Sequence, residues 1–299
     1  MQIRILGSAA GGGFPQWNCN CAGCQAVRQG DAGIHQRTQS SLAIRGNSGN
    51  WFLVNASPDV RQQLERLRES THTSIRSNPI AGVLLSDGEI DHTAGLTILR
   101  ESSEPLQIYG TDTVKQALTA GFSLLSVLEN YCGVEWSVVK PGLVIDLGEI
   151  EVEAFLLPGT PPKYMRDLAS TEDNWVVGFT FRDRISGGVA TYAPALAELT
   201  PSTIDRLETS DCILVDGTFW QNDELVKLGM SDRTALSMGH LPLGGENGSL
   251  KRLSQLSPSR KIFTHINNTN PILIEHSPER QKVEAAGMEV GYDGLTVEL

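Results

Sequence analysis

The chain has 299 residues, of which 40% are hydrophobic and 20% charged, so it can bury a large core and is not disordered. It carries 24 Lys and Arg against 35 Asp and Glu, a net charge of -11, without any basic run, which disfavours nucleic acid as a partner. No apolar stretch approaches the roughly 20 residues that span a bilayer, and the first residues lead into a strand pattern rather than a signal peptide. We therefore expect a cytoplasmic protein with no membrane partner and a single domain over residues 1–299. No pattern predicts an oligomeric state.

Short apolar runs along the chain predict β-strands. They cover residues 2–6, 51–55, 81–85, 106–109, 151–157, 175–181, 189–192, 212–215, 261–264 and 288–297. Some of these runs follow one another closely and others are separated by helical patterns. This mixture favours an α/β fold of the α+β type, with two mixed sheets flanked by helices, over a simple parallel sheet.

Amphipathic spacing predicts the helices. A helix is expected over residues 60–67, after Pro58-Asp59, and similar patterns follow Thr111, Pro201, Gly248 and Pro278. The polar, irregular stretch 163–174 is expected to be a loop over the functional site. The glycines between Gly7 and Gly13 lack a phosphate-loop or dinucleotide motif, so they predict a tight turn beside the site.

An acidic cluster with one histidine follows the third predicted strand: Asp87, Glu89, Asp91 and His92. Open α/β sheets place their chemistry at the carboxyl ends of strands, so these residues are the first site candidate. Three carboxylates and an imidazole packed together repel one another unless a divalent cation compensates them. The alternative is a solvated acidic loop before a helix that starts near Thr93, where acidic residues are favoured.

Two later strands end in the same way, at Asp216 and at His265. If these strands are neighbours of the first, both residues converge with Asp91 and His92 on a metal site with two histidines and two carboxylates. Nitrogen and oxygen ligands of this kind suit Fe(II), Mn(II) or Zn(II). Taken singly, Asp216 could also belong to an Asp-Gly turn and His265 could be a hydrogen-bonded histidine at a strand end.

The other histidines differ in their surroundings. His240 lies among glycine and proline in a loop, and three roles are open to it: metal ligand, general acid or base, or plain loop residue. His35, His72 and His276 lie in polar surroundings and are expected to be exposed.

Three cysteines, Cys19, Cys21 and Cys24, lie within six residues. In a cytoplasmic protein this cluster predicts a structural zinc rather than a disulfide, within a zinc-binding loop over residues 17–35. Tetrahedral zinc needs a fourth donor, which the sequence leaves undecided, and a reactive thiol is the alternative. The candidates for the fourth donor are Asn268, His276, His35 and Asp31.

These motifs together resemble the metallo-β-lactamase superfamily, whose fold is an αββα sandwich with metals at one edge. Its signature His-x-His-x-Asp-His corresponds here to Asp87-x-Glu89-x-Asp91-His92, so the first two histidines are absent. A further expected histidine near residues 157–160 is absent as well. The resemblance implies that the first metal site is lost and that the second, Asp91, His92, Asp216 and His265, is kept. A two-zinc hydrolase is therefore disfavoured.

The finer resemblance is to the family of pyrroloquinoline quinone (PQQ) biosynthesis protein B, over nearly the whole chain. It rests on seven further motifs and the acidic one: Asn18-Cys19-Asn20-Cys21-x-x-Cys24, Arg37-Thr38-Gln39-Ser40-Ser41, Asn55-Ala56-Ser57-Pro58-Asp59, Glu89-x-Asp91-His92-Thr93, Pro158-Gly159-Thr160-Pro161-Pro162-Lys163-Tyr164, Val215-Asp216-Gly217-Thr218-Phe219, Met238-Gly239-His240 and His265-Ile266-Asn267-Asn268-Thr269-Asn270-Pro271.

The family implies a role in making PQQ from a ribosomal precursor peptide with linked Glu and Tyr side chains. The expected step is O2-dependent hydroxylation of the tyrosine ring by Fe(II), with Zn or Mn as other metals. His240 is then assigned to proton transfer, and Asp87 and Glu89 to bonds with metal ligands or with the substrate's amino group. Expected partners are the precursor peptide or a tyrosine-containing intermediate, PQQ itself and other proteins of the pathway. The alternatives are a non-catalytic carrier that assists transport of PQQ or its precursor to the periplasm, and a degenerate metal-dependent hydrolase.

Overall fold

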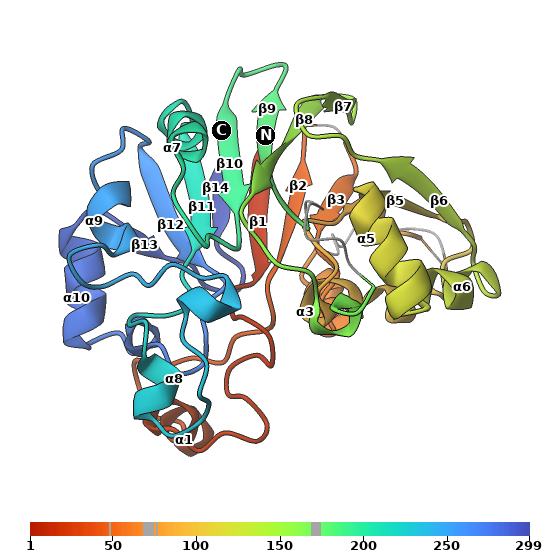
Figure 1. The fold of residues 1–299 in the computed structure, drawn as a ribbon. Helices are drawn as coiled ribbons and strands as arrows, with labels where there is room; N and C mark the ends of the chain where they lie inside the picture. Colours follow the sequence, from red (N-terminus) through yellow and green to blue (C-terminus); the bar gives the residue numbers. More distant parts are fainter. Residues whose placement is uncertain (48, 68–74, 76, 169–174) are drawn as a thin grey trace.

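The protein forms two β-sheets packed face to face, with helices on the outer face of each, in the metallo-β-lactamase arrangement (Figure 1). The computed structural model describes residues 1–47, 49–67, 75, 77–168 and 175–299. The expected αββα sandwich of two mixed sheets is confirmed. Within the described residues, no helix combines the length and the apolar character that crossing a membrane requires.

The first sheet has the strand order β14-β1-β2-β3-β4-β5-β6. Its strands from β14 to β3 are antiparallel and those from β3 to β6 are parallel. Their bounds are β1 Gln2–Gly7, β2 Ser41–Arg45, β3 Trp51–Val54, β4 Ile80–Leu84, β5 Leu106–Gly110, β6 Val134–Val138 and β14 Thr296–Glu298.

The second sheet repeats this plan with the order β13-β12-β11-β10-β9-β8-β7. It is parallel from β13 to β10 and antiparallel from β10 to β7. Its strands are β7 Val144–Asp146, β8 Ile150–Leu157, β9 Val176–Asp183, β10 Val189–Ala193, β11 Cys212–Asp216, β12 Arg260–Thr264 and β13 Glu289–Val290.

Three apolar layers hold the sandwich together. The layer between the sheets contains the fully buried Tyr192, Phe179 and Phe181 from the second sheet, packed with strand residues of the first such as Ile5 and Leu42. Side chains alternate between the faces of a strand, so each sheet also has an apolar outer face for its helices to cover.

Helices cover the two outer faces. The first sheet is covered by α2 Val60–Glu65, α4 Leu96–Leu99, α5 Asp112–Gln116, the π-turn Ala117–Gly121 and α6 Leu124–Glu129. The second sheet is covered by α7 Pro201–Glu208, α9 Ser249–Leu253 and α10 Pro278–Ala285. Near one end of the sandwich lie α1 Ala22–Gln29, α3 Ile90–Thr93, α8 Glu224–Lys227 and the 3-10 turns Lys163–Met165, Leu236–Met238 and Pro271–Leu273 (Figure 1).

The predicted strands up to residue 264 are all found, with bounds that differ by no more than two residues, and the five predicted helices are found as α2, α5, α7, α9 and α10. The strand predicted over 288–297 is wrong: its two ends form β13 in one sheet and β14 in the other. Strands β2, β6 and β7 were not predicted. The proposed loop 17–35 contains the helix α1.

Candidate metal centre

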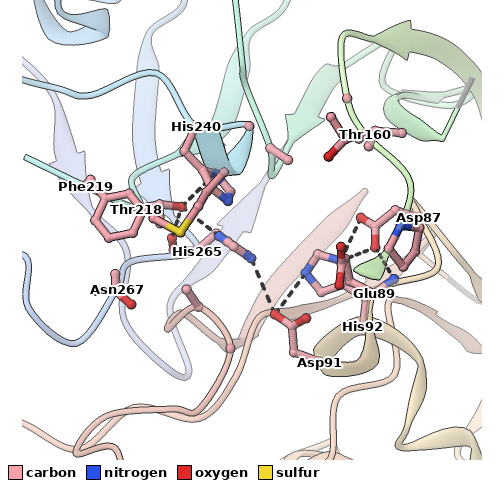
Figure 2. A pocket seen from close by; sticks show the side chains of 18 of the residues that line it. Asp87, Glu89, Asp91, His92, Thr160, Thr218, Phe219, His240, His265 and Asn267 are labelled. Atoms are coloured by element: carbon pink, nitrogen blue, oxygen red, sulfur yellow. Dashed lines mark hydrogen bonds and ion pairs between the residues drawn. The ribbon is translucent and has the colours of Figure 1, made fainter. Parts of the chain in front are cut away.

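The carboxyl ends of strands from both sheets open on one pocket of about 230 Å³ (Figure 2). Asp87 to His92 follow β4, and Thr218 and His265 follow β11 and β12. The turn after β1 adds Ala10 and Gly11, as the glycine pattern predicted. β11 and β12 are neighbours of each other but not of β4, which lies in the other sheet, so the expectation that they are neighbours of β4 was wrong. Positions more than 170 residues apart still meet, because the carboxyl ends of strands from both sheets lie at the same end of the sandwich.

Three predicted metal ligands gather at the floor of this pocket. Asp91, His92 and His265 each offer a ligand atom, and these atoms lie within 4.8 Å of one another. Asp91 Oδ2 is 3.8 Å from His92 Nε2 and 3.7 Å from His265 Nε2. His92 Nε2 is buried and has no hydrogen-bond partner among the described residues. A buried nitrogen that faces a carboxylate without bonding to it fits a metal ion between them.

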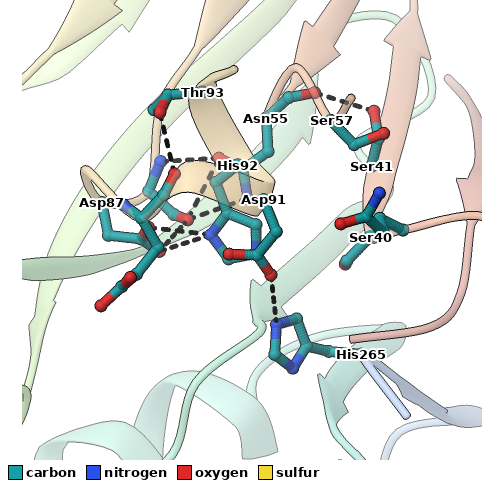
Figure 3. Close-up of polar contacts among 12 residues, drawn as sticks. Ser40, Ser41, Asn55, Ser57, Asp87, Asp91, His92, Thr93 and His265 are labelled. Carbon is teal, nitrogen blue, oxygen red and sulfur yellow. Dashed lines mark hydrogen bonds and ion pairs between the residues drawn. The ribbon is translucent and has the colours of Figure 1, made fainter. Parts of the chain in front are cut away.

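The other ring nitrogen of His92 is held by Asp87, whose carboxylate oxygens lie 2.7 Å and 2.8 Å from Nδ1 (Figure 3). Ser86 Oγ donates to the same carboxylate at 2.8 Å. Burial by itself would lower the pKa of His92, but the charges of Asp87 and Asp91 outweigh it and raise this pKa to about 9. A carboxylate behind a metal-binding imidazole fixes its tautomer and leaves Nε2 for the metal. Asp87 thus contacts His92, which is one of the two contacts that the sequence analysis left open for it.

Asp216 occupies an equivalent position behind His240. Its Oδ2 accepts from His240 Nδ1 at 2.7 Å and from the Leu196 backbone N–H at 2.8 Å. Its Oδ1 accepts from the backbone N–H and the hydroxyl of Thr218, at 2.9 Å and 2.6 Å. Burial opposes the charged form of Asp216, yet the pairing with His240 outweighs it and lowers the pKa of Asp216.

The four predicted ligands therefore do not form one simple cluster. Asp216 belongs to a second group, with His240 and His265, whose ligand atoms also lie within 4.8 Å of one another. The two groups share His265, whose ring lies 5.2 Å from that of His92 and 5.4 Å from that of His240, centre to centre. Asp216 lies behind His240 as Asp87 lies behind His92, and it is also one of the three possible ligands of the second group, so its predicted role as a ligand stays a prediction.

Thr218 connects these groups, and the sequence prediction missed it. Its hydroxyl lies 2.9 Å from His265 Nδ1 and 3.1 Å from His240 Nδ1, besides its bond to Asp216. His265 Nδ1–H can donate to this hydroxyl, which leaves Nε2 for the pocket. Each of the three imidazoles thus has a side-chain partner at Nδ1. The available signals were the position of Thr218 two residues after Asp216 and its place in the motif Val215-Asp216-Gly217-Thr218-Phe219, neither of which gives it a role.

The backbone around the ligands also differs from the expectation. The helix expected to start near Thr93 instead ends there: α3 covers Ile90–Thr93, so Asp91 and His92 are within it. His265 has a positive φ of 54°, in the left-handed region that few residues other than glycine adopt. Gly11 lies against Asp91, because a Cβ at Gly11 would come within 3.1 Å of Asp91 Oδ2.

The remaining walls of the pocket are apolar apart from a few polar groups. Glu89 lines it, and desolvation together with the charges of Asp87 and Asp91 raises the pKa of Glu89 to about 7. The 3-10 turn Lys163–Met165, at the start of the expected loop, is tied to the site because Tyr164 Oη donates to the carbonyl of Gly88. Residues 169–174 of that loop lie outside the described residues. The other lining residues include Pro158, Pro162, Val176, Phe219, Met238 and Asn267.

The cysteine cluster lies at the end of the molecule that carries α1. The sulfur atoms of Cys19, Cys21 and Cys24 lie within 4.8 Å of one another, which suits a tetrahedral metal. Burial raises the pKa of the Cys21 thiol to about 12. Of the candidates for a fourth donor, His35, His276 and Asp31 are exposed and Asn268 is buried beside the sulfurs. His72 lies outside the described residues.

Residues 50–266 match the model of the beta-lactamase superfamily domain, so fold and sequence define the chain as a member of this superfamily. A solved structure with the same fold is a diphosphatase from the PhnP family, which is 20% identical over 100% of this chain and 97% of its own, with a TM-score of 0.70.

Other comparisons are more specific. The coenzyme PQQ synthesis protein B of Azoarcus sp. (strain BH72) is 43% identical over 306 residues, and that of Methylococcus capsulatus is 43% identical over 305, each covering 100% of both chains. The crystal structure of Zn2+-bound PqqB from Methylobacterium extorquens is 35% identical, with a TM-score of 0.89 over 100% of both chains. The chain belongs to the coenzyme PQQ synthesis protein B family.

Proposed function

We propose that this protein acts in the synthesis of coenzyme PQQ as a metal-dependent hydroxylase of a tyrosine ring. The substrate is the linked Glu-Tyr unit derived from a ribosomal peptide, as a peptide or as a smaller intermediate. The observation that carries the proposal is the mixed group of Asp91, His92 and His265, in a family whose members are named for PQQ synthesis. The histidines of a two-zinc hydrolytic site are missing from the signature positions.

The donor set fits Fe(II). Two imidazole nitrogens and one carboxylate oxygen leave coordination positions open, and this combination is typical of non-haem iron sites that use O2. The same donors accept Zn or Mn. Iron is therefore proposed because the proposed reaction uses O2. When bound, the iron would supply the activation of O2.

The pocket walls fit a phenol with an amino group. Phe219, Met238 and Pro162 offer apolar surface to a ring, and Glu89 offers an acceptor to an ammonium group. The pocket lining includes no lysine or arginine in the described part of the chain. Substrate carboxylates are therefore expected to point away from these walls.

His240 is proposed to transfer a proton during the hydroxylation. Burial would lower its pKa, but the Asp216 carboxylate outweighs burial and raises the pKa of His240, which favours the protonated ring. Asp216 and Thr218 engage Nδ1, so the proton available to the pocket is on Nε2. Overall, a ring C–H becomes C–OH, the second oxygen atom leaves as water, and an external two-electron reductant supplies the electrons along with two protons.

The test is to load the protein with iron without O2, add tyrosine-containing candidate substrates and a reductant, and then admit air. Mass spectrometry should show one added oxygen atom that depends on O2. Cleavage without O2 would identify a hydrolase, and binding without any mass change would identify a carrier, so either result overturns the proposal.

The matched variant is His92→Ala, which removes an imidazole whose Nε2 faces Asp91 at 3.8 Å. The variant should lose both its bound iron and its hydroxylation activity. Full turnover by this variant would remove the site assignment even if the wild-type protein hydroxylates.

We also propose that Cys19, Cys21 and Cys24 bind zinc. The proposed partners are the precursor peptide, PQQ and other proteins of the pathway.

A further inference from the structure

The side-chain amide of Asn268 lies over the three cysteine sulfurs, and the backbone carbonyl of the same residue accepts from Cys21 Sγ at 3.6 Å. Its Nδ2 lies 3.1 Å from Cys19 Sγ, 3.4 Å from Cys24 Sγ and 3.8 Å from Cys21 Sγ, and the residue is only 5% exposed. One amide nitrogen carries two hydrogens, so it cannot donate to three sulfurs at once. A buried amide in contact with all three sulfurs occupies the place of a fourth ligand.

The distances agree with tetrahedral zinc. Zn–S bonds of about 2.3 Å and a Zn–O bond of about 2.1 Å put the oxygen roughly 3.6 Å from each sulfur. The observed separations of 3.1 Å to 3.8 Å span this value. The two ends of an asparagine amide have nearly the same size, so a half turn about Cβ–Cγ places Oδ1 where Nδ2 now lies.

The other candidates are placed less well. The side chain of His35 is 71% exposed, and its Nε2 pairs with Glu275 at 3.4 Å. His276 and Asp31 are exposed as well. In the described part of the chain, the three cysteines form a group of metal-binding side chains that no histidine or carboxylate joins.

Asn268 also belongs to the segment that carries the active-site residues His265 and Asn267. This segment is bonded to two neighbouring loops: Ile266 N–H donates to Ser8 O at 2.9 Å, and Asn267 N–H donates to Thr218 O at 3.0 Å. A metal bound by Asn268 and the cysteines would add a third attachment, to α1. His265, which has a left-handed backbone, is three residues from that attachment.

We propose that Asn268 Oδ1 completes a Cys3Asn zinc site, and that this zinc positions His265 for the active-site metal. The inference rests on the proposed zinc at the cysteines and is independent of the hydroxylation. It assigns the site a positioning role in addition to a structural one.

The first test measures zinc. Asn268→Leu removes the donor at nearly constant volume, and Asn268→Asp keeps an oxygen there. Asn270→Leu is the matched control, because it breaks the bond from Asn270 Nδ2 to Gly217 O in the same segment without touching a sulfur. Competition with a chromogenic chelator should show at least tenfold weaker zinc binding for Asn268→Leu, and wild-type binding for the other two. Unchanged zinc affinity and an unchanged Co2+ spectrum in folded Asn268→Leu would overturn the assignment.

A second variant decides the matter if Asn268→Leu fails to fold. Asn268→His should convert the site to three sulfurs and one imidazole, and X-ray absorption of the zinc-loaded variant should show imidazole scattering. Its absence would mean that position 268 does not reach the metal, which overturns the proposal.

The positioning role is tested by Mn2+ affinity at the active site, followed by electron paramagnetic resonance. Asn268→Leu that has lost its zinc should bind Mn2+ about tenfold more weakly, as changes behind a ligand commonly do. Asn268→Asp should bind Mn2+ like the wild type. Equal Mn2+ affinity in all three proteins would refute the coupling. No measurement here involves O2 or a tyrosine substrate, so the hydroxylation can fail while this inference holds, and the reverse.

Discussion

At the scale of single residues, Thr218 is the side chain on which most of the site depends. Its hydroxyl is buried between Asp216, His240 and His265. Thr218→Val keeps the shape but removes the hydroxyl, so it should cost about 1–3 kcal/mol of unfolding free energy because Asp216 and His265 each lose a partner. Thr218→Ser keeps the hydroxyl and should cost less. Urea denaturation measures the difference, and equal stability of the two variants would contradict the role assigned to Thr218.

Asp87 is the residue that prepares His92 for a metal. Asp87→Asn keeps the size and one acceptor but removes the charge that faces Nδ1. Near pH 9, where the His92 proton competes little with the metal, we expect a 10- to 100-fold loss of Mn2+ affinity, the usual effect of altering the partner of a metal-binding histidine. Calorimetric titration measures it, with Asp205→Asn on the exposed side of α7 as the control. Equal losses in both variants would show a general effect of charge instead.

The residue types explain which parts of the site could be predicted from the sequence. Asp91, His92 and His265 bind metals by their chemistry and follow apolar runs, so their places at strand ends were enough to group them, although β4 and β12 lie in different sheets and are not the neighbours that the prediction assumed. Thr218 has no metal chemistry of its own, and its role exists only through its neighbours. The place of Asp216 behind His240 depends on side-chain directions, which spacing along a chain does not fix.

At the scale of elements, the burial of a strand decides whether its sequence pattern predicts it. Strands such as β11, with every residue buried, are continuous apolar runs bounded by polar residues, and their bounds were predicted within two residues. β7 has three residues and two of them are exposed, so it carries no comparable signal. The run 288–297 is divided between the sheets by Gly291 and Gly294, and Asp293 between them accepts from Ser8, Thr38 and Arg66.

The helix α3 and the turn before it give the site its pH dependence. His92 has an ordinary pKa of 6.5, which the neighbouring carboxylates raise to about 9 against the effect of burial. A raised pKa means that the metal-free protein is stabilised by this group below pH 6.5 and loses that stabilisation as the pH rises through about 9. A metal that binds His92 must displace the same proton, so the affinity for the metal should rise as the pH rises.

Metal affinity at the pocket should therefore rise with pH, by about tenfold per unit below pH 9 for the His92 proton alone. Mn2+ titrations between pH 6 and 8, in buffers with different heats of ionisation, measure both the slope and the protons released. Asp87→Asn should flatten the slope because it removes a charge that raises the pKa of His92. An affinity independent of pH in the wild-type protein would rule out this competition.

At the scale of the whole molecule, the two sheets share a large apolar layer, whereas α1 contributes only Cys24, Val27 and their neighbours to the core. Zinc at the cysteines would therefore stabilise a part of the molecule to which α1 contributes few buried side chains. At free zinc 100 times above its Kd, the stabilisation is about 2.7 kcal/mol, and its loss would lower the Tm of a chain of this size by roughly 4 °C.

Cys21→Ser should show this loss, and its activity per metal-loaded molecule should fall less than its stability. The variant should also contain less zinc, measured by elemental analysis beside differential scanning calorimetry. Cys132→Ser is the control, since Cys132 lies outside the cluster and is half-buried. If Cys21→Ser keeps both the wild-type Tm and the wild-type zinc content, the cysteines hold no structural metal, and the attachment of α1 to the segment after β12 must come from packing alone.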